Sequence, residues 1–90
     1  MEMYLHLGQN TLVPVASVLG VFDLDNSTSS HITRKFLNNA EKNKKVINIA
    51  EDIPRSFVLC RENGDTVIYL SQLSSQTLLK RSQSSSLFGL

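Results

Sequence analysis

The sequence predicts a small α+β domain: a mainly antiparallel sheet of about six short strands, one amphipathic helix and a short C-terminal helix. Short apolar runs separated by turn residues indicate the strands, and one segment with apolar residues at helical spacing indicates the helix. The length of 90 residues, 41% of them hydrophobic and 19% charged, allows a single core. We expect residues 1–82 to form this domain and the serine-rich residues 83–90 to form a flexible tail.

Three strands are expected before residue 25. Residues 3–7 alternate between apolar and polar side chains and precede a turn at residues 8–10, so residues 11–15 are predicted to return as the second strand of a hairpin. Pro14 favours an edge position for that second strand, because proline cannot donate a ladder hydrogen bond. Val18 to Leu24 is an almost unbroken apolar run, which predicts a central strand buried on both faces.

A helix is predicted from about Ser30 to Asn43. Several capping side chains at residues 26–30 precede it, and its apolar residues recur at helical spacing so that they face one side: Ile32, Phe36, Leu37 and Ala40. The opposite side is mostly basic and polar, with Arg34, Asn38, Glu41 and Lys42. Lysines at the end of the segment suit the negative end of the helix dipole.

Strands dominate the second half of the chain. Residues 46–49 are predicted to form a short strand, residues 56–61 a buried strand, and residues 66–70 its hairpin partner. Asn63-Gly64 predicts the turn of that hairpin because both residues accept positive φ angles. Ser74 or Ser75 is expected to cap one or two helical turns around residues 78–81.

Charge is unevenly distributed along the chain, although the net charge is only +1. Residues 31–45 hold five Lys and Arg and one Glu, whereas residues 1–30 carry −3. A nucleic-acid or membrane partner therefore cannot be inferred from net charge, and any DNA surface must be local. The single Cys60 cannot form an internal disulfide, and neither a secretion signal nor a membrane span is predicted, so we expect a cytoplasmic protein.

The residues predict no enzyme, no cofactor and no small-molecule substrate. His6 falls on a predicted strand and His31 in the first helical turn, and both are interpreted as surface or hydrogen-bonding residues. Cys60 ends an apolar run and is interpreted as a small buried hydrophobe. The four glycines are scattered, which excludes a phosphate-binding loop.

One segment matches the start of a calcium-binding loop. Asp23, Asp25 and Ser27 have the spacing of its first three ligands. The loop also requires Gly at its sixth position and Glu at its twelfth, where this chain has Thr28 and Arg34. We therefore predict no metal site.

Basic side chains form the remaining candidate surface, and we predict that it binds double-stranded DNA. Six residues are assigned to it: Arg34, Lys35, Lys42, Lys44, Lys45 and Arg55. Cations grouped on a helix edge bind phosphates without reading the base sequence, and the affinity falls with salt. The alternative interpretation is a solvated helix face.

Two stretches resemble a known family: MYLHLG at residues 3–8, and PRSFVL at residues 54–59 with YLSQLSSQTLLKRS at residues 69–82. They resemble the RemA/RemB family of small bacterial extracellular-matrix regulators, most closely its RemB branch. The resemblance implies a cytoplasmic DNA-binding transcriptional regulator that supports biofilm-matrix gene expression without catalysis or a cofactor. It also implies assembly into rings that bind DNA through a repeated basic surface.

The chain departs from the RemA branch where arginines are implicated in DNA contact. Ser17, Asp52 and Ile53 stand at those positions, and Arg55 is retained. Two hypotheses follow: a DNA-binding regulator that uses other cations, such as the helix cluster or Lys80-Arg81, or an oligomeric protein-interaction module without direct DNA binding.

A closed homo-oligomer is expected under either hypothesis. The core of so short a chain is small, and one helix covers only part of the apolar runs at residues 18–22 and 57–60.

Overall fold

The computed structural model describes residues 3–24 and 30–88, with residues 30 and 83–88 described by their backbone alone. It confirms the α+β class and the mainly antiparallel strands. The elements in order are β1 (Tyr4–Gly8), β2 (Thr11–Pro14), the 3-10 turn η1 (Val15–Ser17), β3 (Val18–Asp23), α1 (Ser30–Lys42), β4 (Val46–Asn48), β5 (Ser56–Glu62), β6 (Asp65–Ser71) and α2 (Ser75–Phe88).

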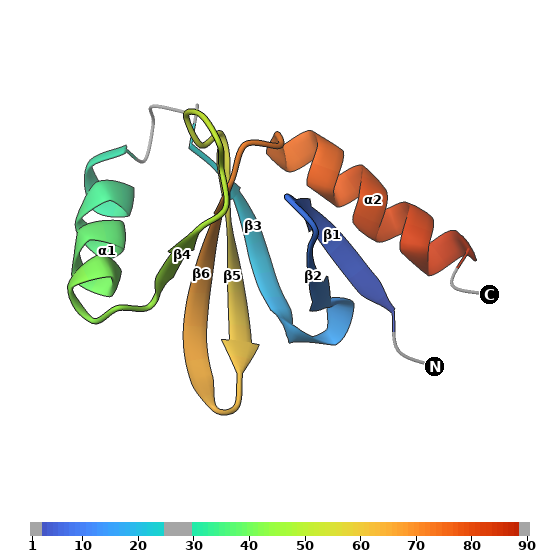
Figure 1. Ribbon diagram of the computed structural model, residues 1–90, viewed down its shortest axis with the longest axis horizontal. Helices are drawn as coiled ribbons and strands as arrows, with labels where there is room; N and C mark the ends of the chain where they lie inside the picture. The colour runs from blue at the N-terminus through green and yellow to red at the C-terminus, as the bar shows by residue number, and fades with distance from the viewer. Residues whose placement is uncertain (1–2, 25–29, 89–90) are drawn as a thin grey trace.

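The six strands form two sheets rather than one. The β1–β2 hairpin is a two-stranded sheet, and the other strands form a four-stranded sheet in the order β3-β5-β6-β4. Both predicted hairpins are confirmed, and Asn63 and Gly64 have positive φ angles of 53° and 83° at the second turn. The β4–β6 pair is parallel. Figure 1 shows α1 and α2 at opposite ends of the molecule, with the strands between them.

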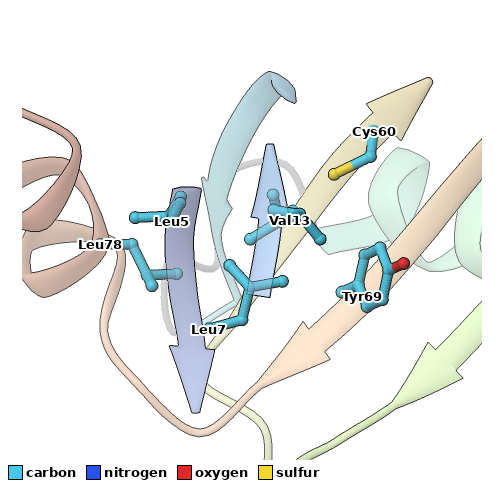
Figure 2. Close-up of a cluster of buried hydrophobic side chains, with 7 residues drawn as sticks. Leu5, Leu7, Val13, Cys60, Tyr69 and Leu78 are labelled. Atoms are coloured by element: carbon cyan, nitrogen blue, oxygen red, sulfur yellow. The ribbon is translucent and has the colours of Figure 1, made fainter. Parts of the chain in front are cut away.

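The hydrophobic core lies between the β1–β2 hairpin, α2 and one face of the four-stranded sheet (Figure 2). Its buried members are Leu5, Leu7, Val13, Val58, Cys60, Tyr69 and Leu78. The alternation predicted for β1 is confirmed, because Leu5 and Leu7 are buried and the residues between and before them are exposed. Cys60 is fully buried, as predicted from its place in an apolar run.

The prediction that Val18 to Leu24 is a central strand buried on both faces is wrong. β3 lies at an edge of the four-stranded sheet, and Leu19 and Phe22 are 57% and 44% exposed. The β5–β6 hairpin occupies the centre instead. A register shift between Val18 and Gly20 also interrupts the regular alternation of faces on β3. An apolar run indicates a strand but does not place it within a sheet.

The bounds of α1 match the prediction to one residue, but its apolar side is only partly covered: Leu37 and Ala40 are half-buried. Ile32 is 75% exposed and Phe36 is 43% exposed. The reason is the position of α1, which lies beside the β4 edge of the sheet rather than across the core (Figure 1). The helical spacing of apolar residues therefore predicted the helix correctly, but it does not tell how much of that side the rest of the chain covers.

α2 is longer than the sequence predicted. Its backbone is helical to Phe88, whereas one or two turns followed by a tail from residue 83 were expected. The serine-rich stretch holds no Gly or Pro before residue 89, and serine lowers helix propensity only modestly, so nothing in it ends the helix. Ser74 caps α2 as predicted, because its Oγ accepts a hydrogen bond of 3.1 Å from the amide of Thr77.

Several sequence predictions fall outside the described residues. They are the capping side chains at residues 26–29, the calcium-loop positions Asp25, Ser27 and Thr28, and the last two residues of the predicted tail.

Candidate functional site

The C-terminal turn of α1 gathers three of the predicted cations. The amide of Lys45 donates to the carbonyl oxygen of Ala40 at 2.9 Å, and the amide of Lys44 donates to that of Glu41 at 3.0 Å. Lys44 has a φ of 58°. This pair of bonds around a left-handed residue is a Schellman motif, in which glycine is usual at the position of Lys44. The motif holds Lys42, Lys44 and Lys45 at the negative end of the helix dipole.

Lys45 is tied to the sheet as well. Its Nζ lies 3.2 Å from Oδ2 of Asp65 at the β5–β6 hairpin. Its carbonyl oxygen accepts a hydrogen bond of 2.8 Å from the amide of Ile68 on β6. The Asp65 side chain is mostly exposed, so the ion pair contributes little stability, but it neutralises much of the charge that Lys45 offers to another ligand.

Lys35 and Lys42 border a hollow on the surface of α1. Seven residues separate them, so they lie on the same side of the helix about 10 Å apart along its axis. The hollow is lined by Ile32, Lys35, Phe36, Asn38, Asn39 and Lys42. The sequence placed Lys42 and Asn38 opposite the apolar side, whereas here they border the same hollow as Ile32 and Phe36. The hollow thus combines an apolar floor with two cations.

The other predicted cations lie elsewhere. Arg34 is exposed and does not line the hollow. Arg55 precedes β5, where its amide donates to the carbonyl oxygen of Ser71 at 2.8 Å and its own carbonyl oxygen accepts from the amide of Leu24 at 2.9 Å. These bonds place Arg55 at the end of β6, away from the C-terminal turn of α1. Two groups of cations therefore lie close together in the structure. Lys35 and Lys42 border the hollow, and Lys42 also lies beside Lys44 and Lys45 at the end of α1. The six predicted residues do not form a single cluster.

A row of aromatic rings joins α1 to the sheet. The Phe36 ring centroid lies 6.4 Å from that of Phe57 on β5, and Phe57 stacks on Phe22 of β3 at 4.8 Å. Phe57 is buried, whereas the outer two rings are each more than 40% exposed. Gly20 lies beneath the Phe22 ring, since a β-carbon at position 20 would come within 2.8 Å of it. The apolar floor of the hollow thus continues onto the sheet.

A second exposed feature is the loop between β4 and β5, in which the sequence analysis noted Asp52 and Ile53 only as departures from the RemA branch. Glu51, Asp52 and Ile53 are all exposed, and Ile53 at 77% is the most exposed large hydrophobic residue in the described chain. The loop is anchored by a hydrogen bond of 2.9 Å from the amide of Glu51 to Oε1 of Gln72. One signal in the sequence could have identified this loop as an exposed surface: an isoleucine that follows two carboxylates and precedes Pro54.

Among the described residues, two titratable groups have clearly shifted pKa values, and both belong to the core. Burial, followed by a hydrogen bond of 2.6 Å to Glu62, raises the pKa of Tyr69 well above its usual range. Burial likewise raises the pKa of the Cys60 thiol. A raised pKa favours the unreactive thiol over the thiolate. Within residues 3–24 and 30–88, His, Cys, Asp and Glu side chains form no group that could hold a metal ion.

Comparison with known proteins identifies the family. The model of the RemA-like family, described as extracellular matrix regulatory protein A-like, matches residues 4–81, from the first strand into α2. The chain belongs to the RemA-like family. A second comparison finds 37% identity over 81 residues with the extracellular matrix regulatory protein B of Bacillus subtilis (strain 168). That alignment covers 90% of this chain and 91% of the relative.

Membership of the RemA-like family confirms the resemblance noted in the sequence. The matched span includes α1, the hollow and the exposed 51–53 loop. No helix in the described part of this chain has both the length and the hydrophobicity needed to cross a membrane.

Proposed function

We propose that this chain is a cytoplasmic, non-enzymatic DNA-binding regulator of bacterial extracellular-matrix gene expression that acts as a homo-oligomer. The matrix role is supported by the similarity to extracellular matrix regulatory protein B. The observation that carries DNA binding is the concentration of exposed cations on α1 and its C-terminal turn: Arg34, Lys35, Lys42 and Lys44. Glu41 is the only carboxylate between residues 31 and 45.

An assembly compensates for the small charge of each protomer. A chain with a net charge of +1 makes few phosphate contacts, and each contact adds a small, salt-dependent contribution. Repeated copies of the same cation cluster raise the effective concentration for every further contact once one protomer is bound. DNA binding and self-association therefore support each other in this proposal.

The test measures binding to duplex DNA as a function of salt. Arg34 and Lys44 are the residues to change, because both are exposed and neither borders the hollow or forms the Asp65 ion pair. We expect Arg34→Gln with Lys44→Asn to weaken binding to all duplexes and to flatten the slope of log affinity against log salt by about 0.9 per lost contact. Asparagine tolerates the left-handed conformation at position 44.

The matched control removes the same charge elsewhere. Arg61→Gln with Lys80→Gln has the same net charge as the test variant, and both residues are exposed on other elements. Because the proposal assigns DNA contact to the helix cluster and not to the other candidate, Lys80-Arg81, the control should keep the wild-type slope. A flattened slope in the control alone would show that the DNA surface lies outside α1. An unchanged slope in the test variant would contradict the assignment of DNA binding to α1 and its C-terminal turn.

One observation favours the alternative function, a protein-interaction module without DNA binding. The hollow exposes Ile32 and Phe36, which have no use in contacting phosphates. Under this alternative, the wild-type protein would assemble but would not bind a matrix-gene promoter at low salt, even at tens of micromolar protein.

A further inference from the structure

We propose that the acidic loop at residues 51–53 of one protomer docks into the hollow on α1 of the next, which gives a head-to-tail assembly. This inference rests on the oligomeric part of the proposed function and names the two surfaces that meet. It assigns Lys35 and Lys42 to the contact between protomers, so that Arg34 and Lys44 are the α1 cations left for DNA in the assembly. The occupant is a second copy of this chain. The argument uses charge complementarity, exposed apolar area and the rigidity of the loop.

The charges of the two surfaces are complementary. The hollow has Lys35 and Lys42 on its border, and the loop carries the exposed carboxylates Glu51 and Asp52. Packing two hollows against each other would bring like charges together, which disfavours a symmetric contact through α1. Opposite charges on two different surfaces favour a contact between unlike patches.

The apolar parts are complementary as well. Ile53 projects from the loop with 77% of its surface exposed, and Ile32 in the hollow is 75% exposed. Phe36 extends the apolar floor toward Phe57. DNA phosphates would neutralise the lysines but would leave this apolar surface in water. An acidic loop that carries an isoleucine satisfies both features of the hollow.

The loop is held in place before binding. Asn48 Oδ1 accepts a hydrogen bond of 2.9 Å from the amide of Ala50, and Gln72 Oε1 accepts one of the same length from the amide of Glu51. On the far side, the amide of Arg55 bonds to Ser71, and Pro54 restricts the backbone of Ile53. A loop fixed at both ends loses little conformational entropy when it docks.

Within one chain, the loop does not cover the hollow. Ile53 and Ile32 are both largely exposed in the same molecule. Figure 1 shows α1 beside β4, while the loop lies at the end of the sheet where β4 and β6 finish. A contact between unlike surfaces repeats from copy to copy, and it closes a ring when the rotation between copies allows.

Charge reversal on each surface tests the contact, with mass measured by sedimentation at low salt without DNA. We expect Lys35→Glu with Lys42→Glu to reduce the assembly to single 10.0 kDa chains, and Glu51→Lys with Asp52→Lys to do the same. The chain with all four substitutions should recover the wild-type mass, because both surfaces are reversed together. Arg61→Glu with Lys80→Glu carries the same charge change elsewhere and should keep the assembly.

The apolar contact has its own matched pair. Ile53→Ser should weaken assembly by about tenfold to a hundredfold, the amount expected from burying an isoleucine side chain. Leu12→Ser removes a side chain that is 59% exposed on β2 and should leave the mass unchanged. Every substituted residue lies on the surface, so each variant should fold. Circular dichroism of each variant checks this.

A covalent readout completes the test. In a chain carrying Ile32→Cys and Ile53→Cys, mild oxidation should produce a ladder of linked protomers, whereas fully buried Cys60 stays unreactive. A wild-type mass of one chain, either reversal pair keeping its mass, or a four-fold variant that stays monomeric would each overturn the proposal. These readings contain no DNA, so they are independent of the salt-slope test above.

Discussion

The buried hydroxyl of Ser71 on β6 donates a hydrogen bond of 2.7 Å to the carbonyl oxygen of Leu7 on β1. Oγ of Ser71 also accepts a hydrogen bond of 3.0 Å from the amide of Leu73. One fully buried side chain thus links the two sheets and shapes the turn into α2. It thereby hydrogen-bonds a buried backbone carbonyl and a partly buried backbone amide.

Ser71→Ala should lower the free energy of unfolding by about 1–3 kcal/mol, because it removes both hydrogen bonds, one of them to a buried carbonyl oxygen. Thr11→Ala is the control, since its hydroxyl makes a single exposed bond of 3.4 Å to Gln9 and its loss should matter less. Urea denaturation of both variants measures the difference. Equal losses of unfolding free energy in the two variants would show that the buried Ser71 hydrogen bonds stabilise the fold no more than the exposed Thr11 bond does.

Lys44→Gly should raise the free energy of unfolding by up to about 1 kcal/mol, because glycine adopts the left-handed conformation at position 44 without strain. Lys42→Gly removes the same charge two residues earlier, from the last residue of α1, and should lower stability by about 0.5–1 kcal/mol. Thermal unfolding of the two variants should therefore give shifts of opposite sign. Shifts of the same sign would contradict the Schellman assignment.

Gly20→Ala should destabilise the protein by about 1–3 kcal/mol, because its β-carbon would displace the Phe22 ring from its stack on Phe57. In a Phe22→Leu background the added methyl group meets no ring, so the same change should be nearly neutral. A double-mutant cycle from denaturant unfolding gives the coupling between the two positions. A coupling of zero would mean that the ring and the glycine are independent.

Stability should fall as pH rises above about 9 to 10, the range in which cysteine and tyrosine ionise in the unfolded chain. The folded state raises the pKa of Tyr69 and of Cys60, so there the folded chain retains protons that the unfolded chain releases. By linkage, this stabilisation is fully present below the unfolded pKa values and is lost above them, at up to about 1.4 kcal/mol per pH unit for each group.

Tyr69→Phe isolates the tyrosine contribution to that alkaline loss. The variant should be less stable at neutral pH, because it lacks the bond to Glu62, yet its stability should fall less steeply above pH 10. The comparison requires unfolding curves at several alkaline pH values, and identical slopes in the two proteins would exclude Tyr69 as a source.

Local patterns in the sequence determined the elements of this protein. The alternation around Leu5 and Leu7, the Asn63-Gly64 turn and the helical spacing within α1 each depend on neighbours a few residues apart. Backbone stereochemistry and side-chain period act at that range, so the bounds of these elements were predictable. The kind of candidate site, a basic helix edge, was also predictable, because it depends on residue types alone.

Tertiary packing decided where those elements lie and which surfaces they leave open. The place of β3 at a sheet edge depends on its pairing with β5, which is distant in the sequence. The exposure of Ile32, the ion pair of Lys45 with Asp65 and the projection of Ile53 depend in the same way on contacts between separate segments. Hydrophobic periodicity shows which side of an element is apolar, but what covers that side follows only from the free energy of packing the whole chain.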